Sequence, residues 1–309
     1  MSKIPQTVVH YAQFDPFERP GGVSRFARNL TLIFDSVIFM HRKTLDVGYV
    51  EKHHFPVICD FHTALDWPER IPVVGFLHGI ASVKWTVTHA LHDLWLIRAQ
   101  GKAVRRKNTV WTACAEWIAR QAGVRYGLKV PHIIYHPVDM NTFDGRLTSG
   151  NPRLILHDAR TRHKGRKLLE HLASKFPGWA FVSLECTPEQ VPDRLRSARA
   201  FIHLSRYEGN SLVANEAMAM NLPCLFTEVG LFLDADGPTE VYRVEADKVF
   251  RDKAALEKEF AAFTASLDVR TYNPRVWMLR HATPEKSREG WRKVMKEFQK
   301  LSGWEPGTA

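Results

Sequence analysis

The chain has few cysteines and no long apolar run. Its four cysteines, Cys59, Cys114, Cys186 and Cys224, show neither paired nor metal-ligand spacing, so we expect reduced thiols and a cytoplasmic protein. No apolar stretch approaches the roughly 18 residues that cross a bilayer, and the first residues lack the apolar core of a signal peptide. The GxGxxG pattern is also absent, so nothing favours a dinucleotide-binding protein.

The size of the chain favours two domains. At 309 residues, with 45% apolar and 25% charged residues, each half is long enough for its own core. We expect one domain over 1–145, a second over 151–283 and a C-terminal helical segment over 284–309.

The charge is basic and unevenly distributed. The net charge is +10, and residues 1–150 hold 18 lysines and arginines against 12 acidic residues, together with ten of the fifteen histidines. This balance suggests a polyanionic partner, either nucleic acid or an anionic membrane surface. A basic surface without such a partner is the alternative.

Short apolar runs alternate with helical patterns along the whole chain, which is typical of α/β proteins with parallel sheets. The expected strands are 7–12, 37–40, 57–59, 73–77, 109–113, 133–135, 153–157, 180–184, 200–204 and 224–227.

One stretch combines this pattern with two carboxylates. A polar turn follows the strand 200–204, a helix is expected over 211–220, and Pro223 precedes the next strand. Glu208 lies in the turn and Glu216 lies on the helix, eight residues later. The free amides at a helix N-terminus suit a phosphate, so both glutamates would flank a bound anion.

This stretch resembles the E-x7-E signature of the retaining family-4 glycosyltransferases. The matching pattern is S-x-x-E-G-x6-E-A-M-A-x3-P, from Ser205 to Pro223. The resemblance implies the GT-B fold, in which two Rossmann-like parallel-sheet domains face each other across a cleft. It also implies that the first domain binds the acceptor, that the second binds the nucleotide sugar, and that the C-terminal helix packs back on the first.

Three further motifs resemble the same family. Arg160 and Lys164 correspond to its G-R…K-G pair, although Ala159 replaces the usual glycine; two fixed cations suit a departing diphosphate. The His78-Gly79 pair resembles the H-G loop, which would place His78 beside the donor sugar and the acceptor. The Gly21-Gly22 turn resembles one that lies near the donor phosphates and the acceptor.

The resemblance implies a retaining transfer from a nucleotide sugar, with a UDP-hexose as the default donor and no metal or other cofactor required. Catalysis would fall to Glu208, Arg160, Lys164 and His78. The leaving phosphate would take the acceptor proton. The donor-binding residues would be Glu216, Gly209, Asn210, Ser211, Leu212, Val213, Gly21 and Gly22.

The acceptor stays open between two classes. One is a glycan or glycolipid at the inner membrane face, where the protein would be peripheral. The other is a hydroxymethylated DNA base, as for phage-type DNA glycosyltransferases. A basic segment offers candidate acceptor contacts, or else a solvated helix end: Lys84, Arg98, Lys102, Arg105 and Arg106.

Two other interpretations differ in kind. A catalytically silent GT-B protein would bind nucleic acid or a sugar nucleotide without transferring anything. A single-domain GT-A transferase would hold Mn²⁺ through Asp234 and Asp236, at the end of an apolar strand expected over 231–237.

Overall fold

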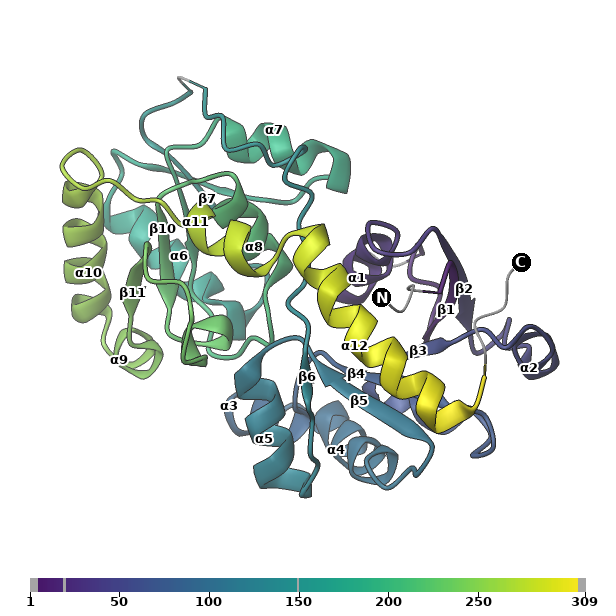
Figure 1. The fold of residues 1–309 in the computed structure, drawn as a ribbon. Helices are drawn as coiled ribbons and strands as arrows, with labels where there is room; N and C mark the ends of the chain where they lie inside the picture. Colours follow the sequence, from purple (N-terminus) through teal and green to yellow (C-terminus); the bar gives the residue numbers. More distant parts are fainter. Residues whose placement is uncertain (1–4, 19–20, 149, 305–309) are drawn as a thin grey trace. The chain divides into compact units, whose positions relative to one another are not determined.

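The computed structural model describes residues 5–18, 21–148 and 150–304 (Figure 1). The chain forms two compact units. The first comprises Met1–Pro137 with Pro284–Ala309, and the second comprises Val138–Thr283.

The first unit is built on a parallel sheet with the strand order β2-β1-β3-β4-β5-β6. Every residue of β3 and β4 is buried, which explains why these strands are continuous apolar runs rather than alternating ones. The strands are β1 (Thr7–Ala12), β2 (Ser36–His41), β3 (Val57–Asp60), β4 (Val73–Leu77), β5 (Thr109–Ala113) and β6 (His132–Ile133).

The helices of this unit come from both ends of the sequence. They are α1 (Gly22–Leu30), α2 (Val47–His53), the 3₁₀ helix η1 (Phe61–Asp66), α3 (Ala81–Thr88), α4 (Leu91–Ala103), α5 (Glu116–Tyr126) and α12 (Pro284–Ser302).

The C-terminal helix α12 packs on β4, β5 and β6, as Figure 1 shows. Its residue Trp291 is 1% exposed. The indole ring stacks on Phe76 with centroids 5.9 Å apart and meets the edge of Phe34 at 5.5 Å. The guanidinium of Arg288 donates to the carbonyls of Leu32 and Ile33. A segment far along the sequence therefore completes the core of the first unit.

The second unit contains a parallel sheet with the order β11-β10-β9-β7-β8. Its strands are β7 (Leu154–His157), β8 (Ala180–Ser183), β9 (Ala200–His203), β10 (Cys224–Thr227) and β11 (Tyr242–Val244). Its helices are α6 (Arg166–Lys175), α7 (Val191–Arg196), α8 (Leu212–Ala219), α9 (Ala246–Arg251), α10 (Lys253–Ser266) and α11 (Arg275–His281), with 3₁₀ turns η2 (Arg162–Lys164), η3 (Pro188–Gln190) and η4 (Gly230–Leu233).

The expected α/β class with parallel sheets is confirmed. The expected strand over 231–237 is wrong, because Gly230 takes a left-handed φ of 64° and the chain continues as η4. Residues 138–148 pack with the second unit, where the Arg275 guanidinium donates to the carbonyls of Met140 and Phe143.

Among the described residues, no helix combines the length and apolar character that crossing a membrane requires.

Each sheet has one place where successive strands are added on opposite sides. In the second unit β7 has β8 on one side and β9 on the other, and in the first unit β1 lies between β2 and β3. Loops leaving the carboxyl ends of strands diverge at such a point, so a ligand can enter between them. The topology thus marks β7–β9 and β1–β3 as places for a site.

We expect Trp291→Ala to lower the free energy of unfolding by about 3–5 kcal/mol, because it leaves a cavity between Phe34 and Phe76. Urea unfolding would measure the change. Lys293→Ala, on the exposed face of the same helix, should stay within about 0.5 kcal/mol of the parent protein. Equal stabilities of the two variants would contradict the packing role of α12.

Candidate functional site

The carboxyl edge of β7, β9 and β10 carries a cluster of charged and polar side chains in the second unit. Asp158 directly follows β7, and Glu208 lies in the turn after β9. Thr227 is the last residue of β10. These three strands are adjacent in the sheet, so residues distant in sequence meet at one edge.

The Lys164 ammonium lies between two carboxylates. Its Nζ is 2.9 Å from Asp158 Oδ2 and 3.4 Å from Glu208 Oε1. The other oxygen of Asp158 accepts from Arg160 Nε at 2.8 Å. The Asp158 side chain is 5% exposed, whereas that of Arg160 is 49% exposed. One buried aspartate thus fixes both cations and leaves part of the guanidinium open to solvent.

Charge pairing decides the ionisation of Glu208. Burial raises the pKa of this carboxyl, but the Lys164 ammonium and the hydrogen bond from His203 Nε2, at 3.1 Å, outweigh it and lower the pKa to about 2. Burial lowers the pKa of Lys164, and Glu208 and Asp158 outweigh that in turn, so its pKa is raised. The pair is therefore charged at neutral pH.

Two local devices fix the backbone around this pair. The Thr227 hydroxyl accepts from Ser205 N at 2.9 Å and donates to Ser205 O at 2.6 Å, which locks the turn after β9 to β10. Gly165 has a φ of +78°, and a Cβ there would lie 2.4 Å from Leu204 O. Only glycine fits beside the end of β9, so Lys164 is held directly against it.

Helix α8 begins at the same edge. Its N-cap is Ser211, whose side chain makes no capping hydrogen bond, so the first amides of the helix are not capped by that hydroxyl. Below them, buried Asn215 donates from Nδ2 to Asn210 Oδ1 at 2.8 Å. Glu216 is half-buried on α8. The structure thus joins Glu208, Lys164 and Arg160 through direct contacts and places Glu216 on the adjoining helix.

A second cluster lies at the carboxyl edge of the first unit. Asp60 Oδ1 is 3.3 Å from His10 Nε2 and 2.9 Å from His78 Nε2. Burial raises the pKa of Asp60, but the two imidazoles outweigh it, so the pKa lies well below its usual range. The ionised carboxylate only accepts hydrogen bonds, so both histidines donate through Nε2.

A third histidine stacks against this cluster. The ring of His136 lies 5.5 Å from that of His78 with an angle of 22° between the planes. Burial, followed by the neighbouring His78, holds the pKa of His136 well below its usual value, so this ring is neutral at neutral pH. At the start of α1, a Cβ added to Gly21 or Gly22 would meet no heavy atom within 4 Å, so the space around these two glycines is open.

The five basic residues proposed as acceptor contacts fall into two groups. Arg106 is 8% exposed and donates to the carbonyls of Pro68 and Ile71 at 2.7 and 2.5 Å. Lys84 Nζ pairs with buried Asp93 at 3.0 Å. For these two the acceptor interpretation is corrected, because their charged groups serve internal contacts. The exposed members of the set are Arg98, Lys102 and Arg105.

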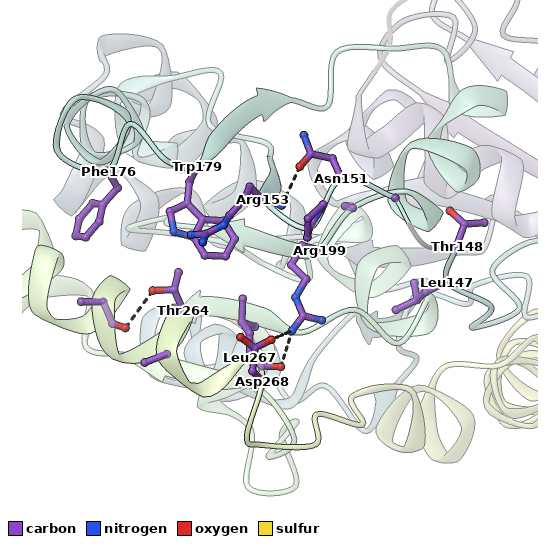
Figure 2. A pocket seen from close by; sticks show the side chains of 15 residues that line it. Leu147, Thr148, Asn151, Arg153, Phe176, Trp179, Arg199, Thr264, Leu267 and Asp268 are labelled. Carbon is purple, nitrogen blue, oxygen red and sulfur yellow. Dashed lines mark hydrogen bonds and ion pairs between the residues drawn. The ribbon is translucent and has the colours of Figure 1, made fainter.

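A cavity of about 950 Å³ lies at the opposite edge of the second sheet (Figure 2). Arg153, Trp179 and Arg199, which line it, directly precede β7, β8 and β9. The Arg153 guanidinium lies 5.2 Å from the Trp179 ring. This cavity lies at the amino ends of the strands, whereas parallel sheets bind ligands at their carboxyl ends. We therefore take the charged cluster around Glu208 as the candidate site.

The Asp-x-Asp pair lacks the structure that a GT-A metal site needs. It follows the turn η4 instead of a strand. The two residues also differ in environment, since Asp234 is 7% exposed whereas the Asp236 carboxylate is 77% exposed and pairs with His281 at 3.3 Å. In the described ranges, no three His, Cys, Asp or Glu side chains are grouped so that they could hold a metal ion.

Sequence reasoning did not identify several members of these clusters. Asp158, His203 and Thr227 in the second unit, and His10 and Asp60 in the first, were not singled out. Each lies in or directly after an apolar run expected as a strand. A polar residue at the carboxyl end of a parallel strand is the signal that could have found four of them.

We expect Lys164→Met to raise the pKa of Glu208 above its parental value of about 2, because burial then acts without the largest compensating charge. Carbon-detected NMR titration of labelled glutamates would measure it. In the parent protein the stabilisation from this carboxylate is present above pH 4.5 and is lost as the pH falls towards 2. Lys175→Met, on the exposed end of α6, is the control, and an unchanged Glu208 pKa in Lys164→Met would refute the pairing.

We expect Asp60→Asn to lower the free energy of unfolding at neutral pH by about 1.5–3 kcal/mol, because two charge-assisted hydrogen bonds from His10 and His78 are weakened. Denaturant unfolding would test this, with exposed Asp35→Asn as the control. Since the pKa of Asp60 is depressed in the folded protein, the difference from the parent should shrink as the pH falls below about 3.8. A difference that is independent of pH would argue against the ionised cluster.

The family comparison matches part of the second unit. Residues 157–258 match the model of the family described as glycosyl transferases group 1, a range that includes Arg160, Lys164, Glu208 and Glu216. No curated protein matches the chain in a sequence comparison.

Solved structures match nearly the whole chain. Sucrose-phosphate synthase from Thermosynechococcus elongatus has a TM-score of 0.73 at 16% identity, covering 96% of this chain and 100% of that one. A glycosyltransferase from Rickettsia africae has a TM-score of 0.67 at 12% identity, covering 96% and 98%. HepE from Anabaena, solved in complex with UDP and glucose, has a TM-score of 0.67 at 14% identity, covering 94% and 99%. The chain therefore has the fold of the GT-B glycosyltransferases, and its residues 157–258 correspond to a glycosyl transferases group 1 domain.

Proposed function

We propose that this protein is a retaining glycosyltransferase that moves a hexose from a nucleotide sugar, by default a UDP-hexose, to a hydroxyl of a polyanionic acceptor. The observation that carries the proposal is the Lys164 ammonium held between Asp158 and Glu208, at the carboxyl edge where the sheet order diverges. The HepE structure was solved with UDP and glucose, and this supports the same donor class.

The donor diphosphate would bind against Arg160 and Lys164. Asp158 orients both cations, so they are in place before the negative charge grows on the departing diphosphate. The half-exposed guanidinium of Arg160 offers its remaining N–H groups to phosphate oxygens. In this proposal the two side chains supply the charge stabilisation for which other transferases use a metal ion.

The rest of the donor would contact the turn after β9 and the start of α8. The backbone of residues 209–213 would hold the diphosphate, and Glu216 would accept hydrogen bonds from the ribose hydroxyls. Because His203 and Lys164 both contact Oε1 of Glu208, we assign Oε2 to the hydroxyls of the transferred sugar. Glu208 would act as a binding group that stays ionised, and the leaving phosphate would take the acceptor proton.

The first unit would supply the acceptor side. Ionised Asp60 accepts from Nε2 of His78, and this hydrogen bond would leave the opposite ring nitrogen of His78 for a substrate hydroxyl. The open backbone at Gly21 and Gly22 would allow a ligand to approach closely. Two acceptor classes would complement the basic charge of residues 1–150: an anionic glycan or glycolipid, and DNA that carries a hydroxymethylated base.

We expect Glu208→Ala and Lys164→Ala each to lower the transfer rate by about 10²–10³-fold, because each removes a fixed group that contacts the donor in the transition state. The assay is the hexose mass gain on hydroxymethylated duplex DNA and on a lipid-linked glycan extract, with a mixture of nucleotide sugars. Glu170→Ala, an exposed residue on α6, should retain the parental rate.

The outcomes of this assay separate the alternatives. A gain on the lipid fraction assigns the glycan acceptor, and a gain on the DNA nucleosides assigns the base. Binding of a nucleotide sugar without hydrolysis or transfer, and with the same affinity in Glu208→Ala, would overturn the proposal in favour of a silent binder.

A further inference from the structure

The outer face of α4 in the first unit exposes apolar and basic side chains together. Leu91, Leu94 and Trp95 are 82%, 40% and 51% exposed. Arg98 and Lys102 follow at helical spacing, and Arg105 continues the row in the turn after the helix. We call these six residues the α4 face. Its apolar half begins the helix and its cationic half ends it.

The opposite side of α4 is firmly packed. The buried residues of the helix are Asp93, Ala99, Gln100 and Ala103, and α4 contacts α3 and η1. The Gln100 amide accepts from Ala81 N at 2.8 Å and donates to Gly79 O at 3.2 Å. The exposure of the α4 face therefore belongs to a well-anchored helix.

The α4 face carries no acidic side chain from α4 itself. The one acidic residue within α4 is Asp93, which is 0% exposed. Its carboxylate oxygens are 3.0 Å from Lys84 Nζ and 2.8 Å from Thr88 Oγ1. Exposed His92 also reaches Asp93 Oδ1 at 3.0 Å. The Asp93 carboxylate is thus neutralised by partners within α3 and α4. It does not offset the positive charge of Arg98, Lys102 and Arg105.

We propose that the α4 face docks on an anionic lipid surface. Three neighbouring apolar side chains standing in water are unfavourable, and phosphates alone would not cover them. A bilayer interface accepts both halves, since leucine and tryptophan insert at the level of the acyl boundary while arginine and lysine contact anionic headgroups. A nucleic-acid groove would satisfy the three cations and leave Leu91, the most exposed of the set, in solvent.

The α4 face lies on the same helix that contacts the loop of His78. Gln100 connects α4 to the carbonyl of Gly79, directly after His78. A surface bound through α4 would therefore lie across this one helix from the loop of His78. The docking itself needs no nucleotide sugar and is independent of the transfer reaction proposed above.

Co-sedimentation with vesicles tests this inference. We expect the full chain to bind vesicles of phosphatidylcholine with about 30% phosphatidylglycerol, and to bind pure phosphatidylcholine much more weakly. Replacing Arg98, Lys102 and Arg105 together by glutamine should weaken binding about 100-fold, at roughly fivefold for each charge. The matched control replaces Arg292, Lys293 and Lys296, exposed cations of α12, by glutamine and should bind like the parent.

A second variant tests the apolar half. Leu91→Ser with Trp95→Ser should abolish most of the binding that persists at high salt, because buried apolar area is not screened. Val269→Ser, at an 85% exposed position in the second unit, is its control. Circular dichroism of each variant would verify that the fold is retained.

Two results would overturn the inference. One is the absence of vesicle binding by the parent. The other is binding of duplex DNA that the glutamine variant loses and the serine variant keeps, since this pattern assigns the face to nucleic acid. Loss of transfer in Glu208→Ala with vesicle binding intact would show that the two proposals stand or fall separately.

Discussion

A lysine ammonium enclosed by two carboxylates sets the geometry of the second unit's site. Asp158 and Glu208 outweigh the desolvation of Lys164 and raise its pKa, and Lys164, followed by the hydrogen bond from His203, lowers the pKa of Glu208. The pair constrains the backbone as well, since Gly165 must lie against the end of β9 for the ammonium to reach both oxygens. Glycine placement and ionisation state are therefore linked through one contact, at an edge that the strand order creates.

The two units use the same topological position with different chemistry. The second unit places a compensated cation between β7 and β9, whereas the first places an ionised aspartate between imidazoles at β1, β3 and β4. Cations suit a departing diphosphate, and an oriented imidazole suits a hydroxyl. This division of labour matches the proposed separation of donor and acceptor binding between the units.

Much of the fold, but only part of the candidate site, could be predicted from the local sequence. Strands such as β4 and β10 were predicted with their observed bounds, because a strand buried on both faces is a continuous apolar run. Glu208 was found through its motif, whereas His203 was hidden within an apolar strand. Asp158 was missed although its partners, Arg160 and Lys164, lie only two and six residues further along the chain. The same limit explains Arg106, which has the same charge as Arg98 and lies in a carbonyl-lined interior. Only burial distinguishes Arg106 from Arg98, and burial depends on the whole fold.

The position of α12 has a consequence for synthesis of the chain. The core of the first unit needs Trp291 against Phe76, and the 146 residues of the second unit, Val138–Thr283, are translated between these two partners. During translation, the surface of the N-terminal sheet that α12 covers therefore stays exposed until the second unit has been synthesised. Nascent chains arrested before residue 284 should accordingly be held by chaperones that recognise exposed apolar surface.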